Sequence, residues 1–231
     1  FERAGLKAWP GIEVEWDGGW VRRAAGGYTQ RANSMQVFDP HDDRDAEARI
    51  ETGAQWLRSR GIRPTFRVTP QVGKRVLDAL DATGWREVDA SHLFAMALTV
   101  VEPDPGGEIY DLLDPVFLAA QQRLQGYSDE RLGKLKALLS VLQVPGAGVV
   151  MHSPAGDPVA TALMVIGDGI VVTGNVVTDP AERRKGYAAA MMRTGLAWAR
   201  GSGASIAALN VAAGNPGAQA LYRSLGYARQ Y

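Results

Sequence analysis

The chain has 231 residues, of which 46% are apolar and 22% charged, a composition typical of a globular protein with one large or two small domains. Its 25 basic residues balance 25 acidic ones, so no global positive field exists to attract a nucleic acid or a membrane surface. Cysteine is absent, which excludes disulfides, thiol nucleophiles and cysteine-bound metals, and the three histidines are too scattered to indicate a metal site.

The chain begins without a signal-peptide pattern, and no apolar run approaches the roughly 20 residues that span a membrane, so we expect a cytoplasmic protein. Residues 1–105 alternate between strand and helix patterns. Strands are predicted at residues 20–23, 34–38, 65–68 and 93–101, and helices at 43–58 and 74–82. This order is close to that of the second half, so we expect two copies of one α/β fold, each with a mixed sheet flanked by helices.

A linker is predicted at residues 102–107, because the Pro and Gly residues of Glu-Pro-Asp-Pro-Gly-Gly prevent either regular element from continuing. It divides the chain into residues 1–105 and residues 106–231. The second unit is predicted to contain helices at 112–124 and 129–142, and strands at 148–152, 159–166 and 170–177.

The stretch from residue 175 to residue 200 contains the first sign of a ligand site. Residues 176–178 fit the end of a strand, which the following Asp179-Pro180 pair terminates because proline donates no backbone N–H. The cationic loop Arg183-Arg184-Lys185-Gly186 then comes directly before helix-forming residues that begin at Tyr187. Backbone N–H groups in such a loop and in the first helical turn have no intrahelical partner and attract anions. The stretch is therefore predicted to hold a phosphate.

Neither the Walker loop nor the dinucleotide fingerprint Gly-x-Gly-x-x-Gly is present here. The pattern Arg183-x-x-Gly186-x-Ala188 instead resembles the pyrophosphate loop of the GNAT superfamily of N-acetyltransferases, Arg/Gln-x-x-Gly-x-Gly/Ala. Residues 215–227 resemble a second signature of that family, Asn-x-x-Ala-x-x-Leu-Tyr-x-x-Leu-Gly-Phe/Tyr. The local chemistry agrees, because Asn215 suits a helix N-cap and Gly226 suits the left-handed residue after a helix.

The resemblance implies a tandem GNAT-like acyl-CoA N-acyltransferase fold, with a catalytic domain at residues 106–231 and a degenerate copy at residues 1–105. It implies acetyl-CoA as the cosubstrate, no metal, and acetyl transfer to a primary amine of a small metabolite. Direct attack by the amine is favoured because cysteine, the best covalent acyl carrier, is absent. The residues implied to bind the coenzyme are Val176, Val177, Thr178, Arg183, Arg184, Lys185, Gly186, Tyr187, Ala188 and Asn215. Solvent exposure of the loop cations and a purely capping role for Asn215 are the alternatives.

Tyr222 matches the general acid that protonates the departing thiolate in this family, and simple packing is its alternative role. The resemblance does not identify the general base, because family members use carboxylates, histidines or ordered waters from different positions. Two other functions stay open: acetylation of a protein or peptide amine, and a non-catalytic sensor that binds acyl-CoA through the same loop.

Residues 27–34, Gly-Tyr-Thr-Gln-Arg-Ala-Asn-Ser, resemble a stretch of bacterial GNAT proteins that have an added N-terminal half. Tyr28, Arg31 and Asn33 are predicted to bind the acceptor between the halves, with hydrogen bonding inside the loop as the alternative. Residues 39–45 stand where the first half would carry a phosphate loop, but they contain four aspartates and no glycine. We therefore expect one coenzyme per chain, a small-molecule acceptor, and no nucleic-acid or membrane partner.

Overall fold

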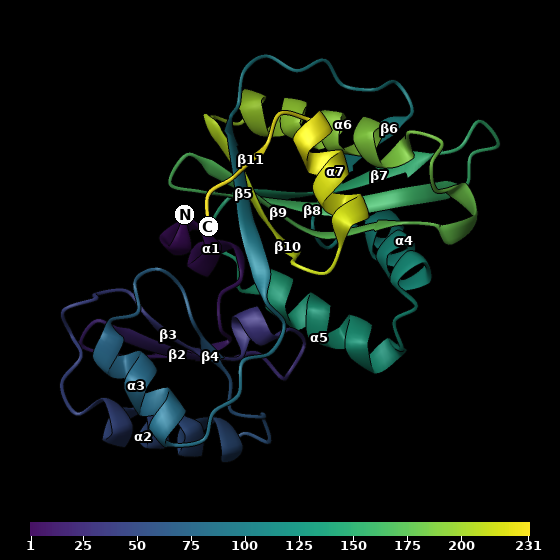
Figure 1. Cartoon of the computed structure of the whole chain (residues 1–231). Coiled ribbons are helices and arrows are strands. Elements are labelled where there is room, and N and C mark those ends of the chain that lie inside the picture. The colour runs from purple at the N-terminus through teal and green to yellow at the C-terminus, as the bar shows by residue number, and fades with distance from the viewer.

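Two β-sheets organise the chain in the computed structural model, which describes residues 1–231 (Figure 1). The smaller sheet has four strands in the order β1-β2-β3-β4. They are β1 (Glu13–Asp17), β2 (Trp20–Ala24), β3 (Met35–Val37) and β4 (Phe66–Arg67). The first three strands are antiparallel neighbours, and β4 runs parallel to β3.

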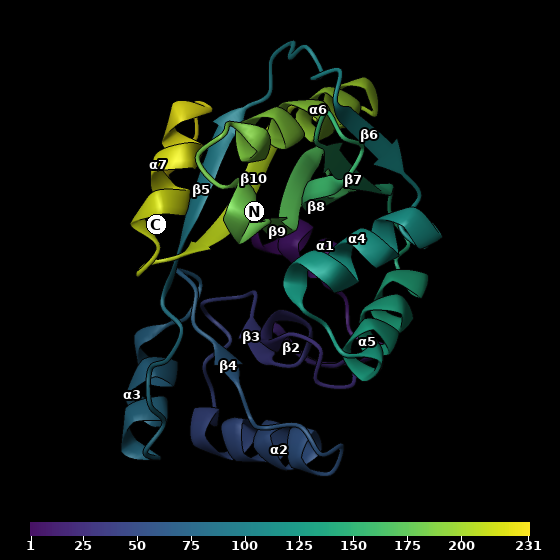
Figure 2. The same cartoon turned by 90° about the vertical axis from the view of Figure 1, so that its right-hand side faces the viewer.

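Helices α2 (Ala46–Arg58) and α3 (Lys74–Ala82) cover the face of the small sheet that is turned away from the larger sheet (Figures 1 and 2). Their apolar side chains pack on buried strand residues such as Trp20 and Val37. Successive side chains of a strand point to opposite faces. The remaining face therefore carries Arg23 of β2, Gln36 of β3 and Arg67 of β4 toward the rest of the molecule.

The larger sheet has seven strands in the order β11-β5-β10-β9-β8-β7-β6. They are β5 (Ser91–Ala97), β6 (Gly107–Tyr110), β7 (Gly146–His152), β8 (Pro158–Gly167), β9 (Ile170–Thr178), β10 (Ile206–Ala212) and β11 (Ala228–Arg229). All neighbours are antiparallel except β9 and β10, which are parallel. The predicted mixed α/β class is confirmed.

Helices cover both faces of the larger sheet, and the alternation of side chains divides its core in two. The first cluster lies under α6 (Tyr187–Gly201) and α7 (Pro216–Ser224), where Met164 of β8 is buried. The second lies under α1 (Glu2–Ala8), α4 (Pro115–Gln125) and α5 (Asp129–Ser140), where the neighbouring Leu163 and Val165 are buried. Figure 2 shows α6 and α4 on opposite sides of the sheet.

Strand β5 departs from the expected organisation. The sequence predicts a strand at residues 93–101 as the last one of the first unit, but the structure places β5 between β10 and β11 of the larger sheet. Alternation in a sequence indicates which face of a strand is buried and not which strand is its neighbour. The strand ends at Ala97 because its partner Ile206 is the first residue of β10. The division into residues 1–105 and 106–231 stays a prediction.

Four short elements are absent from the sequence prediction: α1, β1, β6 and β11. Strand β1 reads Glu-Val-Glu-Trp-Asp, so its sequence does alternate between polar and apolar residues, although all five residues are exposed in the structure. Gly107, predicted as the end of the linker, is the first residue of β6. The two chain ends lie side by side (Figure 1), and the Tyr231 hydroxyl donates a hydrogen bond to the Glu2 carboxylate.

Candidate active site

Strands β9 and β10 part before either of them ends. Their parallel pairing runs from Ile170 opposite Ile206 to Thr173 opposite Leu209, whereas β9 continues to Thr178 and β10 to Ala212. Along β9 the side chains change from buried to half-buried at residue 175. The edge of residues 174–178 that faces β10 therefore has no strand partner, and it contains the predicted coenzyme residues Val176, Val177 and Thr178.

A β-bulge interrupts the other side of β9 at the same level. Leu163 of β8 is opposite Gly174 and Thr161 is opposite Val177, so two residues of β9 face the single residue between them. Asn175 lies in this bulge with a left-handed φ of 50°, a conformation that asparagine tolerates better than most residues.

Side chains from other elements hold Asn175 in place. Its carbonyl oxygen accepts hydrogen bonds from Gln121 Nε2 at 3.2 Å and from Gln125 Nε2 at 3.1 Å, both on α4. Its Nδ2 donates to the hydroxyl of Tyr28 at 2.7 Å, and that hydroxyl also bonds to the hydroxyl of Tyr127 at 3.0 Å. The conformation of the bulge is thus specified by residues from both halves of the chain.

The loop between β9 and α6 presents a row of free backbone N–H groups. It passes through the short turn η2 (Pro180–Glu182), and Arg184 and Gly186 then have φ values of 65° and 87°. The backbone N–H groups of residues 183–189 donate to no protein acceptor, and the first intrahelical bond runs from Ala190 to the Gly186 carbonyl. Such a curved row at a helix N-terminus binds anions.

The side chains of the loop add positive charge to this row. Lys185 pairs with Glu182 at 3.0 Å, while the exposed Arg183 and Arg184 make no ion pair. No acidic residue lies in the first turn of α6. Tyr187 and Ala188 begin that helix and are half-buried. In the loop predicted from the sequence, backbone N–H groups that have no hydrogen-bond acceptor therefore lie beside guanidinium groups that have no ion-pair partner.

Tyr222 and Asn215 lie on α7, which follows β10. Asn215 caps the helix, because its Oδ1 accepts a hydrogen bond from the Ala218 N–H at 3.0 Å. Tyr222 is buried, its ring stands edge-on to that of Tyr227, and its hydroxyl has no hydrogen bond to another residue. Burial raises the pKa of Tyr222 to about 12, and the Arg31 guanidinium acts in the opposite direction. Arg31 is thus close enough to interact electrostatically with Tyr222.

The three acceptor residues predicted from the first half have different surroundings. Asn33 accepts from the N–H groups of Ala25 and Gly27 and donates to the Thr29 carbonyl, which favours a structural role inside its own loop. Tyr28 bonds to Asn175 and Tyr127 as described above. Arg31 is half-buried and its guanidinium forms no hydrogen bond or ion pair with another residue.

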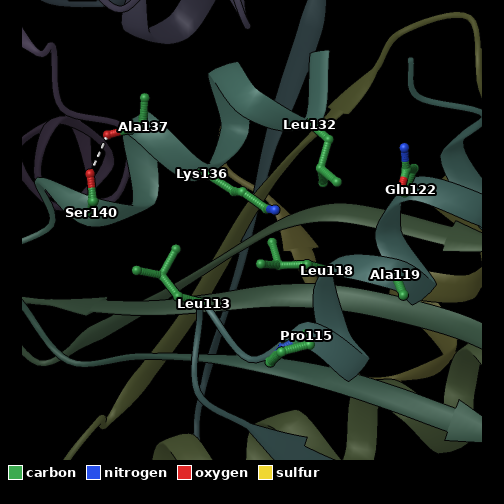
Figure 3. Close-up of a pocket in the computed structure, with 9 residues that line it drawn as sticks. All are labelled: Leu113, Pro115, Leu118, Ala119, Gln122, Leu132, Lys136, Ala137 and Ser140. Carbon is green, nitrogen blue, oxygen red and sulfur yellow. Dashed lines mark hydrogen bonds between the residues drawn. The ribbon is translucent and has the colours of Figure 1, made fainter. Parts of the chain in front are cut away.

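A pocket of about 580 Å³ lies between α4 and α5, away from these residues (Figure 3). Leu113, Leu118 and Leu132 line it, and the Lys136 side chain extends between them. None of the site residues predicted from the sequence contributes to it. The structure contains no group of three or more His, Asp or Glu side chains able to hold a metal, and no helix long and apolar enough to cross a membrane.

The complete chain, residues 1–231, matches the protein-family profile described as "Probable histone acetyltransferase Rv0428c C-terminal". The chain belongs to this acetyltransferase family, within the GNAT superfamily. It is 24% identical over 232 residues to the "Uncharacterized N-acetyltransferase YobR" of Bacillus subtilis, covering 98% of this chain and 92% of that protein.

Solved structures of GNAT proteins resemble the fold over nearly its full length. A GCN5-related N-acetyltransferase from Kribbella flavida has a TM-score of 0.73 and 21% identity, covering 98% of this chain and 90% of its own. A tandem GNAT protein from the clavulanic acid biosynthesis pathway has a TM-score of 0.67 and 12% identity, covering 97% and 83%. The tandem GNAT-like fold expected from the sequence is confirmed.

Several residues around the site of this GNAT chain escape sequence reasoning. Gln121 and Gln125 are ordinary helix residues in the sequence, and only the structure shows that both bond to Asn175. Trp9 packs so closely on Gly174 that a Cβ atom at Gly174 would lie 2.3 Å from Trp9 Cζ2. The one available signal is Asn175 inside a β-branched run, since asparagine is unfavourable in a regular strand.

Proposed function

We propose that this chain transfers the acetyl group of acetyl-CoA to a primary amine of a small metabolite by direct attack. One observation carries the proposal: the consecutive N–H groups of residues 183–189 have no protein acceptor and lie beside the unpaired Arg183 and Arg184. A pyrophosphate supplies the acceptor oxygens and the negative charge that this row of donors requires.

The parting of β9 and β10 supports the same coenzyme. The pantetheine arm of coenzyme A contains amide groups, and the unpaired edge of residues 174–178 offers backbone donors and acceptors to them. The phosphate-binding loop directly continues this edge, through Asp179 and η2. A single coenzyme would therefore place its pyrophosphate on the loop and its thioester toward the bulge at Asn175.

Tyr222 has the chemistry of the general acid. The amine nitrogen forms a bond to the thioester carbon, the carbon–sulfur bond breaks, and Tyr222 donates its proton to the departing thiolate. A pKa raised to about 12 by burial keeps the phenol protonated at neutral pH, and the positive charge of Arg31 would stabilise the phenolate that remains. The proton lost from the amine goes to a base that the proposal leaves unassigned.

Two other functions compete with this one. The family description includes the words "probable histone acetyltransferase", which supports a protein amine as the acceptor. The positive charge of Arg31 near Tyr222 opposes that alternative, because a lysine-rich tail would meet a guanidinium group that has no carboxylate partner. A non-catalytic acyl-CoA sensor would need the loop but not Tyr222.

Thiol release tests the proposal. The protein is incubated with acetyl-CoA and, separately, with small amines and with a histone tail peptide, and the free thiol of coenzyme A is followed. Faster release with a small amine supports the proposal, and release with the peptide alone contradicts the assigned acceptor. Coenzyme binding measured by calorimetry without release from any acceptor would favour the sensor.

A further inference from the structure

Three arginine side chains and one carboxylate gather where α1 meets the smaller sheet. Glu2 of α1 is buried, pairs with Arg67 at 3.2 Å and accepts a hydrogen bond from Gln36 Nε2 at 2.6 Å. Arg23 is fully buried and donates to the Trp9 carbonyl at 3.0 Å and to Gln36 Oε1 at 2.9 Å, but it makes no ion pair. The cluster therefore contains three positively charged guanidinium groups and a single carboxylate, which cannot neutralise all of them.

Arg31 is the member of this cluster without a polar partner. Its Cζ lies 6.0 Å from the centre of the Trp9 ring, at the outer limit of a cation–π contact. The Trp9 ring in turn packs on Gly174, the residue directly after the last pair of β9 and β10. Packing alone thus places the free guanidinium beside the point where the two strands part.

The electrostatic surroundings of Arg31 agree with a position beside the site. Burial and, to a lesser degree, Arg67 lower the pKa of Arg31 to about 10, and Glu2 and Tyr222 oppose this decrease. Burial and Arg67 likewise lower the pKa of Arg23 to about 9, against Glu2. Both groups remain charged at pH 7. A desolvated charge without a partner is unfavourable, and such groups concentrate at ligand sites.

We infer that Arg31 binds a carboxylate of the acceptor, so that the acceptor of this enzyme is a primary amine that also carries a carboxylate group. The inference rests on the proposed function, since Tyr222 defines where the reacting amine lies. A guanidinium group matches a planar carboxylate with two parallel N–H donors, which orients the ligand as well as holding it. The carboxylate supplies the negative charge that Glu2 alone does not provide to the cluster.

Pairs of matched ligands measure whether the protein prefers an acceptor that carries a carboxylate. Each α-amino acid is compared with its carboxamide, which has the same shape and amine but no negative charge, in the presence of acetyl-CoA. We expect kcat/KM to favour at least one carboxylate over its carboxamide by at least about tenfold, as a charge-assisted hydrogen-bonded pair provides. Arg31→Gln should reduce this ratio to about one, and Arg31→Lys should restore part of it.

Arg63→Gln is the control, because Arg63 is exposed, has no partner and undergoes the same change of charge. It should leave the ratio unchanged. Thermal unfolding distinguishes a ligand role from a structural one: Arg31→Gln should not lower Tm, since it removes an unpaired half-buried charge. A lower Tm together with an unchanged ratio would assign Arg31 to the fold and overturn the inference.

Binding measured without turnover tests the inference independently of the proposed function. The same pairs are titrated by calorimetry into protein that is saturated with coenzyme A, which cannot react. Tighter binding of a carboxylate that is lost in Arg31→Gln supports the anion site even if no amine is ever acetylated. Equal binding of carboxylates and carboxamides throughout the series, or no binding of either, would overturn it.

Discussion

Replacing Gly186 tests the proposed phosphate-binding role of the loop at residues 183–189, because the position combines a left-handed backbone with open space. Its φ is 87°, and a Cβ atom added there would meet no atom within 4 Å. Gly186→Gln and Gly186→Glu therefore share one structural cost, the left-handed conformation of an L-residue, of about 1–2 kcal/mol. They differ in a single negative charge, placed in the same loop as the N–H groups that we propose to bind the anion.

The size of the charge effect follows from Coulomb's law. Gly186 is exposed, so the dielectric constant of water applies, and two unit charges about 4 Å apart interact by about 1 kcal/mol. A pyrophosphate carries more than one charge, which makes the Glu-minus-Gln difference about 1–2 kcal/mol, or about 5- to 30-fold in Kd.

Isothermal titration with coenzyme A measures the two variants against the unmodified protein. Both should bind more weakly, and Gly186→Glu should be the weaker. In about 1 M salt the difference between them should decrease, because the Debye length falls to about 3 Å. Equal Kd values for the Gln and Glu variants at low salt would show that the anion does not approach Gly186, and the placement of the pyrophosphate would be wrong.

Tyr222→Phe should lower turnover by about 10²- to 10⁴-fold and leave the Kd of coenzyme A unchanged, and full turnover would exclude Tyr222 as the acid. Since burial raises the pKa of Tyr222 to about 12, the acid form persists, and kcat should show no loss assignable to Tyr222 as pH rises to about 10. Tyr28→Phe should lower the free energy of unfolding, measured in urea, by about 1–3 kcal/mol, because Asn175 Nδ2 loses its acceptor. Tyr110→Phe is the control: it removes an exposed hydrogen bond from Tyr110 to Glu108 and should change the free energy of unfolding little. Calorimetry should find one coenzyme per chain, and a stoichiometry near two would contradict the interpretation of the acidic residues 39–45.

The parts of the site that depend on neighbouring residues were predictable from the sequence. The loop at residues 183–189 needs only a strand end, a glycine and a helix start, and all three are local patterns. The cap of α7 is equally local, and Asn215 forms the expected hydrogen bond. Helix α3 has the predicted bounds, 74–82, because its apolar residues recur at helical spacing and Gly84 follows it.

The parts that depend on distant partners were not predictable. No pattern in residues 91–97 indicates that their neighbours are β10 and β11 rather than a strand of the smaller sheet. The bulge at Asn175 requires Tyr28, Gln121 and Gln125, which lie 147, 54 and 50 residues away in the sequence. The sequence predicts an acceptor-binding role for Arg31 only through resemblance, and its contact with Trp9 is visible only in the folded chain.

These long-range contacts make the two halves one structural unit around the site. Residues 1–105 contribute β5 to the interior of the larger sheet and α1 to its face, where Ala4, Ala8 and Trp9 join the buried core. Without β5, strand β10 would lose its antiparallel neighbour on the side opposite β9, and β11 would have no neighbouring strand. The same half brings Tyr28 to the bulge and Arg31 to Tyr222. If this half has lost coenzyme binding, as we predict, it would be retained for two reasons: it completes the sheet that carries the proposed coenzyme site, and it supplies Arg31, which we propose binds the acceptor.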